Sequence, residues 1–207
     1  MSILLIRHGE TDSNRERIVQ LPETPLSTRG RDQAERLAQR FLSAPPAAIL
    51  SSDLSRAAET AAALSRAIGH PVEEEPLLQE RHFGDLRGIA YADLVENPFG
   101  PNYSPPGGES WSAFHDRVDR AWERIVERRS SLQGDLAVVT HGLVLHSLAV
   151  RHLAWPGVEA PAPENGPPLA FGNTSVSVVE ADAPWRITLQ ACTAHLEDDA
   201  SGGISGL

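Results

Sequence analysis

The chain has 207 residues, of which 41% are hydrophobic and 22% charged, and its formal net charge is -10. This length allows one α/β domain with a full hydrophobic core and is short for two. The negative charge argues against nucleic acid as a partner, because binding to a phosphate backbone needs a basic surface, and no apolar run is long enough to cross a bilayer. We therefore expect one globular domain with neither a nucleic-acid nor a membrane partner.

The cysteine and arginine content narrows the setting of the protein. Cys192 is the one cysteine of the chain, so no internal disulfide can form, which is typical of a reducing cytoplasm. Residues 1–2 lead directly into an apolar stretch without the basic segment that opens a secretory signal, and we expect a cytoplasmic protein. All 18 basic residues are arginine, so any anion site must be built from arginine, histidine and backbone groups.

The N-terminal segment ends in two residues suited to phosphate chemistry. Residues 3–6 form a short apolar run, which predicts a buried strand, and Arg7, His8 and Gly9 follow it directly. Ligands of open α/β sheets bind at the carboxyl ends of the strands. An imidazole beside a guanidinium can attack a phosphoryl group, because its nitrogen is the nucleophile while the arginine holds the anionic oxygens. We interpret His8 as a candidate nucleophile, although for this tripeptide alone a histidine merely hydrogen-bonded at a strand end is the commoner case.

The following elements include a second arginine of interest. Helical turns are predicted over 12–19, a loop over 21–26, a helix from Ser27 or Thr28 to about residue 42, and a strand over 47–50. Polar residues at 51–55 are predicted to cap an alanine-rich helix that reaches about residue 68 and has Arg56 in its first turn. An arginine is unfavourable at the positive end of a helix dipole. Either an anion lies beside Arg56, or its side chain simply extends over the surface.

A candidate acid follows the third predicted strand, which spans 70–78. Glu80 lies in a cluster of charged, aromatic and glycine residues at 79–88. A carboxyl group in a pocket can stay protonated and act as a general acid, provided that burial outweighs the nearby cations. Residues 89–109 are rich in proline and glycine and contain no basic residue, which predicts a loop with one short helix at 91–96. A loop of this length inside a domain is commonly a lid or a binding loop.

The C-terminal half repeats the pattern of the first strand. Apolar spacing predicts a long helix over 111–131, capped by Ser110, and a strand over 136–140 that ends in His141 and Gly142 before a helix over 143–153. We expect a surface loop over 155–168, a hairpin or two edge strands over 175–180 and 187–191, and a disordered tail over 197–207. A strand, a histidine and a glycine thus occur twice in the same order.

Taken in order, these segments resemble the motifs of the histidine phosphatase superfamily, which includes cofactor-dependent phosphoglycerate mutases. The matching segments are Arg7-His8-Gly9-Glu10-Thr11 with Asn14, Thr24-Pro25-Leu26-Ser27 with Gly30 and Gln33, Ser51-Ser52-Asp53-Leu54 with Arg56, Leu78 and Glu80 with Gly84 and Gly88, Gly108-Glu109-Ser110 with Arg117, and Thr140-His141-Gly142. The resemblance covers most of the chain. It implies a three-layer α/β/α sandwich around a mostly parallel sheet with an antiparallel edge strand, formed by a single domain over 1–196 in which 89–109 is a lid or specificity insert.

The resemblance also implies roles for single residues. It makes His8 the residue that is phosphorylated, Glu80 the proton donor, and three residues the clamp on the phosphoryl group, namely Arg7, Arg56 and His141. The residues that would bind substrate are Asn14, Gln20, Thr11, Arg81 and Gly142. Such a mechanism requires no metal and no cofactor, and the histidines and the cysteine of the chain show no zinc-ligand spacing. Leu21 departs from the glycine that many relatives have after the glutamine.

Three functions are compatible with these residues. The first is a phosphomonoesterase that acts on a small phosphorylated metabolite. The second is a phosphoglycerate mutase, which residues 80–84 favour and the short insert disfavours, since mutases grip a bisphosphate with arginines. The third is a phosphate-binding protein without activity, which is disfavoured because the catalytic residues are all present. The insert, with Phe99, Tyr103 and Trp111 in or near it, suggests a leaving group that is uncharged or partly apolar. A homodimer is left open.

Overall fold

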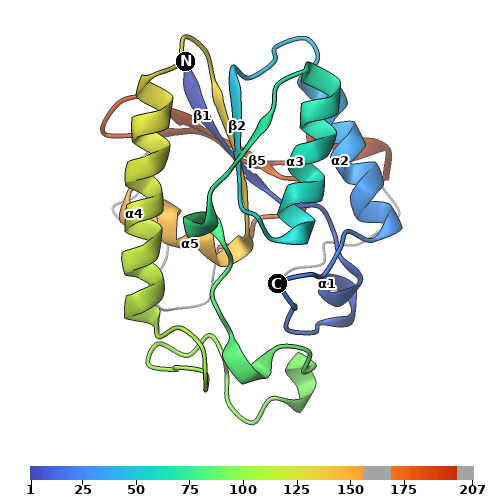
Figure 1. Cartoon of the computed structure of the whole chain (residues 1–207), viewed down its shortest axis with the longest axis vertical. Helices are drawn as coiled ribbons and strands as arrows, with labels where there is room; N and C mark the ends of the chain where they lie inside the picture. The colour runs from blue at the N-terminus through green and yellow to red at the C-terminus, as the bar shows by residue number, and fades with distance from the viewer. Residues whose placement is uncertain (156–168, 200–207) are drawn as a thin grey trace.

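A six-stranded sheet with the order β3-β2-β4-β1-β5-β6 forms the centre of the computed structural model, which describes residues 1–155 and 169–199. The strands are β1 (Ser2–Arg7), β2 (Ala48–Ser51), β3 (Val72–Glu74), β4 (Leu136–Thr140), β5 (Val176–Glu180) and β6 (Ile187–Cys192). The first four pair in parallel, and β5 and β6 are antiparallel (Figure 1). The predicted mostly parallel sheet with an antiparallel edge is confirmed: β5 pairs antiparallel with β1, and β6 antiparallel with β5, over the two stretches expected to form a hairpin or edge strands.

Helices cover both faces of this sheet. The helices α2 (Thr28–Arg40) and α3 (Ser55–Ile68) lie on one face, and α4 (Trp111–Ser130) and α5 (Gly142–Arg151) lie on the other (Figure 1). Side chains of β1 alternate between the two faces, as the pleat of a strand requires. Ile3 and Leu5 belong to the core under α4, whereas Leu4 and Ile6 belong to the core under α2 and α3. The predicted three-layer sandwich is confirmed.

The starts of the helices show where local sequence rules hold. Ser27 accepts a hydrogen bond from the Gly30 amide (3.0 Å) at the start of α2, and Ser110 caps α4, both as predicted. The predicted polar cap of α3 is wrong, because Leu54 occupies that position and no side chain caps the helix. The Ser52 hydroxyl accepts the Leu54 amide and also lies 2.9 Å from a histidine of the site described below.

Other predicted elements differ in extent. The strand predicted over 70–78 is limited to β3, because Glu75 caps the 3-10 helix η1 (Pro76–Leu78) by accepting the Leu77 amide, and proline cannot donate to a strand ladder. The helix predicted at 91–96 is the single 3-10 turn η3 (Tyr91–Asp93). A short helix, α1 (Asp12–Glu16), follows β1, and η4 (Ala194–Asp199) includes the start of the predicted tail. Residues 156–168 of the predicted loop and residues 200–207 lie outside the described residues.

Two glycines allow the loop after β1 to lie against the start of α2. A Cβ atom at Gly30 would be 1.9 Å from the carbonyl oxygen of Glu10, and a Cβ atom at Gly9 would be 2.6 Å from the carbonyl oxygen of Gly30. Both distances are far below van der Waals contact, so no side chain fits at either position. The close packing of these two backbones fixes the loop that carries His8 at the carboxyl end of β1.

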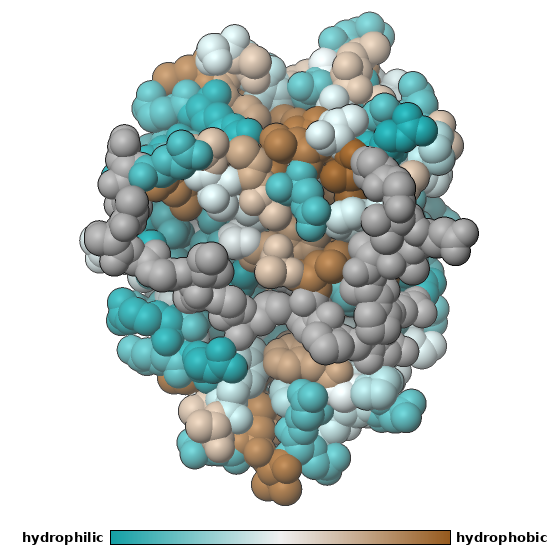
Figure 2. All heavy atoms as spheres, turned by 180° about the vertical axis from the view of Figure 1, so that it is seen from behind, coloured by the Kyte–Doolittle hydropathy of each residue, from teal (hydrophilic) through white to brown (hydrophobic). Residues whose placement is uncertain are grey.

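The molecular surface is mixed in polarity. Seen from behind, hydrophilic residues occupy much of the outline and hydrophobic residues gather toward the middle of the face (Figure 2). Large exposed apolar side chains such as Leu42, Val95 and Leu189 are spread over different segments of the chain. No helix in the described ranges is both long enough and apolar enough to cross a bilayer.

Candidate active site

The sheet places the two histidine motifs side by side. Strands β1 and β4 are parallel neighbours, and their register pairs Arg7 with Thr140, so His8 and His141 leave the sheet next to each other. The two imidazole rings are 5.1 Å apart, centroid to centroid. The repeated pattern of strand, histidine and glycine therefore marks two arms of one site.

One ring nitrogen of His8 is hydrogen-bonded to the backbone, and the other is available as a nucleophile. Its Nδ1 lies 2.7 Å from the carbonyl oxygen of Gly9. A carbonyl can only accept, so Nδ1 carries the proton and Nε2 keeps its lone pair. Burial lowers the pKa of His8 well below the usual 6.5, and the nearby charges of Arg56 and Arg7 lower it further. The geometry holds a neutral imidazole with a nucleophilic Nε2.

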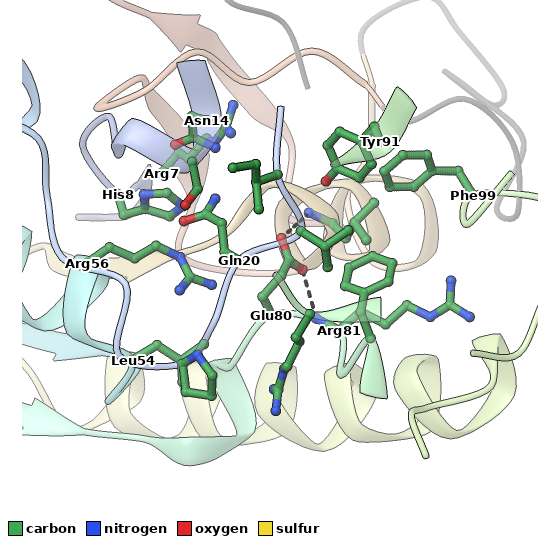
Figure 3. A pocket seen from close by; sticks show the side chains of 17 residues that line it. Arg7, His8, Asn14, Gln20, Leu54, Arg56, Glu80, Arg81, Tyr91 and Phe99 are labelled. Atoms are coloured by element: carbon green, nitrogen blue, oxygen red, sulfur yellow. Dashed lines mark hydrogen bonds between the residues drawn. The ribbon is translucent and has the colours of Figure 1, made fainter. Parts of the chain in front are cut away.

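Two buried arginines flank this imidazole, and all three lie on the same side of the pocket (Figure 3). Arg7 donates to the carbonyl oxygen of Phe171 (2.5 Å), and Arg56 donates to that of Leu21 (3.1 Å). The Nε atoms of both are buried without a partner. Burial lowers the pKa of Arg56 to about 10, so the group stays charged near neutral pH. Two guanidinium groups with unused N–H donors are suited to an anion, and the predicted surface alternative for Arg56 is wrong.

His141 is fully buried and is not among the residues that line the pocket. Its Nε2 lies 2.9 Å from the hydroxyl of Ser52, and its Nδ1 has no partner. Three of the six buried polar side-chain atoms without a partner in the described part of the chain belong to Arg7, Arg56 and His141. This concentration marks the region as a place for a polar ligand, while direct contact of His141 with a phosphoryl group stays a prediction.

Glu80 lies between the histidine side of the pocket and an aromatic side formed by Tyr91 and Phe99 (Figure 3). Its two oxygens accept the amides of Arg81 (2.9 Å) and Leu143 (3.1 Å), the second of which belongs to the first turn of α5. Burial raises the pKa of Glu80 above the usual 4.5, although these two amides and the nearby arginines oppose the shift. The carboxyl group therefore keeps its proton to a higher pH than an exposed glutamate, as a general acid requires.

Arg117 holds the segment that carries Glu80. It donates to the carbonyl oxygens of Leu77 (2.8 Å), Gln79 (2.7 Å) and Glu80 (3.3 Å). Glu109 accepts two hydrogen bonds from this guanidinium, at 2.8 and 2.7 Å. Arg117 belongs to α4 and fixes three carbonyls between residues 77 and 80. The position of Glu80 is therefore set by this helix.

The predicted substrate-binding residues divide into two groups. Asn14 and Gln20 line the pocket, whereas Thr11 and Gly142 do not. The Oδ1 of Asn14 accepts the Thr11 amide (3.2 Å), and the Oε1 of Gln20 accepts the Thr11 hydroxyl (3.0 Å). Thr11 thus holds the side-chain oxygens of Asn14 and Gln20, and contact of their amide N–H groups with a substrate stays a prediction.

Arg81 lines the pocket, but its guanidinium is bound to the backbone of other segments. Its guanidinium donates to the carbonyl oxygens of Pro98 (3.1 Å), Tyr103 (2.7 Å) and Glu109 (3.0 Å), and it lies 3.9 Å from the ring centroid of Trp111. Only 1% of the residue is exposed. Its donors are used within the insert, so Arg81 fastens the insert instead of offering charge to a substrate.

The pocket is also lined by residues that no sequence pattern marked as site residues, among them Phe83, Arg87 and Tyr91. Of the three aromatic residues expected near the substrate, Phe99 lines the pocket, while Tyr103 and Trp111 do not. Trp111 is instead a core residue whose Nε1 donates to the Gly100 carbonyl (2.7 Å). The aromatic and apolar composition of the insert was a usable signal, but it could not tell which rings face inward.

The pocket opens to solvent, and its interior leaves about 50 Å³ for the centres of water-sized molecules. Within the described ranges, no group of three or more histidine, cysteine, aspartate or glutamate side chains is arranged to hold a metal ion. The site is thus assembled from imidazole, guanidinium and carboxyl groups.

Comparison with known proteins agrees with this arrangement. The family model of the histidine phosphatase superfamily (branch 1) matches residues 3–191. The chain is 33% identical to phosphoglycerate mutase-like protein 4 of Arabidopsis thaliana, over 95% of this chain and 87% of that protein. It is 34% identical to the metal-independent phosphoserine phosphatase of the same plant, over 94% and 82% of the two chains. The solved structure of YhfR from Bacillus stearothermophilus superimposes with a TM-score of 0.80 at 28% identity, covering 94% of this chain and 98% of that one. A match of this extent, on a chain that brings the two histidine motifs together, shows that the protein belongs to the histidine phosphatase superfamily.

Proposed function

We propose that the chain is a phosphatase that hydrolyses small-molecule phosphomonoesters through a phosphohistidine at His8, without a metal ion. The observation that carries this proposal is the unprotonated Nε2 of His8 beside two buried guanidiniums, with a carboxyl group of raised pKa in the same pocket. Phosphoryl transfer depends mainly on positioning and charge stabilisation. Arg7 and Arg56 supply the positive charge that magnesium supplies in other enzymes.

The reaction has two steps in this proposal. In the first, Nε2 of His8 forms a bond to phosphorus while the bond between phosphorus and the alcohol oxygen breaks, and Glu80 gives its proton to the departing oxygen. In the second, the Glu80 carboxylate takes a proton from water, and the resulting hydroxide attacks phosphorus as the bond to Nε2 breaks. Inorganic phosphate leaves, and both residues return to their starting states.

A phosphoglycerate mutase is the second candidate, because one of the relatives is a mutase-like protein. A mutase must also hold a second negatively charged group of its bisphosphate. Of the four arginines that line the described pocket, Arg7 and Arg56 flank His8, and Arg81 spends its donors on the insert. Among these four arginines, Arg87 alone is then left to hold a second anion. Because mutases grip a bisphosphate with several arginines, this pocket favours hydrolysis over mutase activity.

The test is phosphate release from a panel of phosphomonoesters in the presence of EDTA, for the parent protein, His8→Ala and the control His70→Ala. His70 is an exposed histidine away from the pocket, so its loss should leave activity unchanged. We expect metal-independent hydrolysis that His8→Ala abolishes, together with an acid-labile phosphoenzyme in the parent alone. Interconversion of phosphoglycerates without net phosphate release would instead identify a mutase, and full activity of His8→Ala would refute the mechanism.

A further inference from the structure

Apolar and aromatic side chains make up much of the pocket wall, on both sides of Glu80 (Figure 3). The members of this set are Ile18, Val19, Leu54, Phe83, Tyr91, Phe99 and Leu143. Tyr91 and Phe99 lie on the opposite side of Glu80 from His8 and Arg56 (Figure 3). A phosphoryl group at His8 would place the alcohol part of the substrate past Glu80, toward these rings. We infer that this aromatic side binds a flat, apolar ring of the leaving alcohol, so that the preferred substrates are phosphomonoesters of aromatic or similarly flat alcohols; the inference rests on the proposed phosphatase function.

The ring of Phe99 contacts the rings of Phe83 and Tyr91 in edge-to-face and tilted geometries that leave surface for a further ring to pack. Phe99 packs edge-to-face on Phe83, with centroids 6.1 Å apart and an interplanar angle of 80°. Tyr91 is tilted by 52° to Phe99 at 5.7 Å. Aromatic rings prefer such offset and edge-to-face contacts, and Tyr91 and Phe99 are only half-buried. Each ring thus has surface left for a ligand.

Polar groups near these rings favour a neutral ligand. Burial raises the pKa of Tyr91 above the usual 10.0, and Glu80 raises it further, so the phenol stays uncharged at neutral pH. The Arg81 guanidinium is occupied by three carbonyls. Arg87 is half-buried, with its NH1 3.0 Å from Nε2 of His82. The Arg17 guanidinium lies over the Tyr91 ring, 5.7 Å from its centroid, and is not among the residues that line the pocket. Among the lining arginines, Arg87 at most is left to match a further negative group, so sugar bisphosphates fit poorly.

The insert is anchored, so the aromatic side is formed before substrate arrives. Arg81 binds the carbonyl of Pro98, the residue before Phe99. The Tyr91 amide donates to the Arg17 carbonyl (2.8 Å), and residues 18 and 90 pair as an antiparallel bridge. Both ring-bearing segments are therefore fixed by backbone contacts to other parts of the molecule. A rigid apolar wall gains affinity because little ordering is needed on binding.

The test compares two esters of primary alcohols, 2-phenylethyl phosphate and glycerol 3-phosphate, with fructose 1,6-bisphosphate as the doubly charged case. We expect kcat/KM for the phenylethyl ester to exceed the other two by about tenfold or more, the scale set by burying one ring. Phe99→Ala should lower kcat/KM for the phenylethyl ester by about tenfold, mainly through KM, and leave glycerol 3-phosphate within about twofold. Val95→Ala is the matched control, because Val95 is in the same insert, is 100% exposed and does not line the pocket.

Several outcomes would overturn the inference. These are equal kcat/KM for the two esters, a preference for the bisphosphate, or an equal loss for both esters in Phe99→Ala. Phe99→Leu keeps an apolar side chain without a ring and should fall between the parent and Phe99→Ala. Calorimetric binding to His8→Ala separates this inference from the proposed function, since that variant cannot turn over. If the phenylethyl ester binds more tightly but the parent does not hydrolyse it, the proposed phosphatase function is refuted and the aromatic binding site is supported. If the parent hydrolyses phosphomonoesters without this preference, the phosphatase function is supported and the aromatic site is refuted.

Discussion

Replacing Glu80 with glutamine tests the general acid directly. Both carboxyl oxygens accept backbone amides, from Arg81 at 2.9 Å and Leu143 at 3.1 Å, so an amide of the same shape keeps one of these acceptors but has no proton to release. General acid catalysis contributes about 10²–10⁴-fold to a rate, which corresponds to about 3–5 kcal/mol of barrier. For an alkyl phosphate we expect Glu80→Gln to lower the rate of phosphoenzyme formation by about a thousandfold.

The assay is a rapid-quench measurement of that first step, with 2-phenylethyl phosphate and 4-nitrophenyl phosphate compared in parent and variant. The nitrophenolate leaves without protonation, so its rate should fall by no more than about tenfold. The sign of the pH dependence follows from the raised pKa of Glu80: the acid form persists above the usual 4.5, and the parent rate falls as pH rises through the raised value. Glu80→Gln should lack this alkaline decline. An equal loss with both esters, or an unchanged alkaline decline in the variant, would refute the assignment.

Four further predictions concern single residues. The pKa of His8 is held well below 6.5, so kcat/KM divided by the fraction of the phosphomonoester dianion, whose pKa is about 6, should stay level as pH falls past 6.5, and a remaining decline centred at 6.5 would contradict the neutral nucleophile. Arg56→Lys should lower kcat by about a hundredfold or more, because one ammonium cannot replace a fork of donors, whereas Arg66→Lys on the exposed side of α3 should leave phosphate release unchanged. Arg81→Ala should lower the free energy of unfolding, measured by urea titration, by about 3 kcal/mol, because buried carbonyls lose their donors. The control Arg120→Ala, at an exposed position, should lower it by less than about 0.5 kcal/mol. Equal effects of the two variants would mean that Arg81 does not anchor the insert. Gly30→Ala should destabilise more than Gly69→Ala, because its Cβ would meet the Glu10 carbonyl at 1.9 Å while Gly69 has only a positive φ of 76° and open space; the reverse order in thermal melts would contradict this.

The phosphoryl side of the site was open to prediction because its parts are local. An apolar run that ends in His8 and a second that ends in His141 each predict a buried strand and a polar residue at its carboxyl end. Ser27 and Ser110 cap their helices as the sequence pattern indicates. The neighbouring positions of β1 and β4 are a property of the sheet order, which no local pattern contains, and here only the resemblance to a known family supplied it.

The alcohol side resisted prediction because long-range contacts shape it. Residues 89–109 contain little regular structure in the described chain beyond one 3-10 turn, so periodicity says nothing about which side chains face inward. Arg81 was the most misleading residue, since a charged side chain next to a catalytic acid is typical of a substrate ligand. Its partners are carbonyls 17 to 28 positions away in the sequence, and a carbonyl acceptor leaves no mark in the residue pattern. The prediction of a polar cap for α3 failed for a similar reason, because the Ser52 hydroxyl contacts His141, the residue that follows the neighbouring strand β4.

Arg81 joins the two sides of the site through different atoms. Its main-chain amide binds Glu80, while its guanidinium binds the carbonyls around Phe99. The register of β1 and β4, which sets His8 and His141, involves no residue of the insert. If the proposed function holds, side chains of the insert can change, and with them the alcohol that fits, without disturbing the proposed nucleophile His8, provided that the carbonyls bound by Arg81 keep their places. A change that displaces those carbonyls would release Arg81, whose main-chain amide binds Glu80, and would therefore affect the proposed proton donor as well as the proposed substrate site. The insert thus tolerates changes of side chain more readily than changes of backbone.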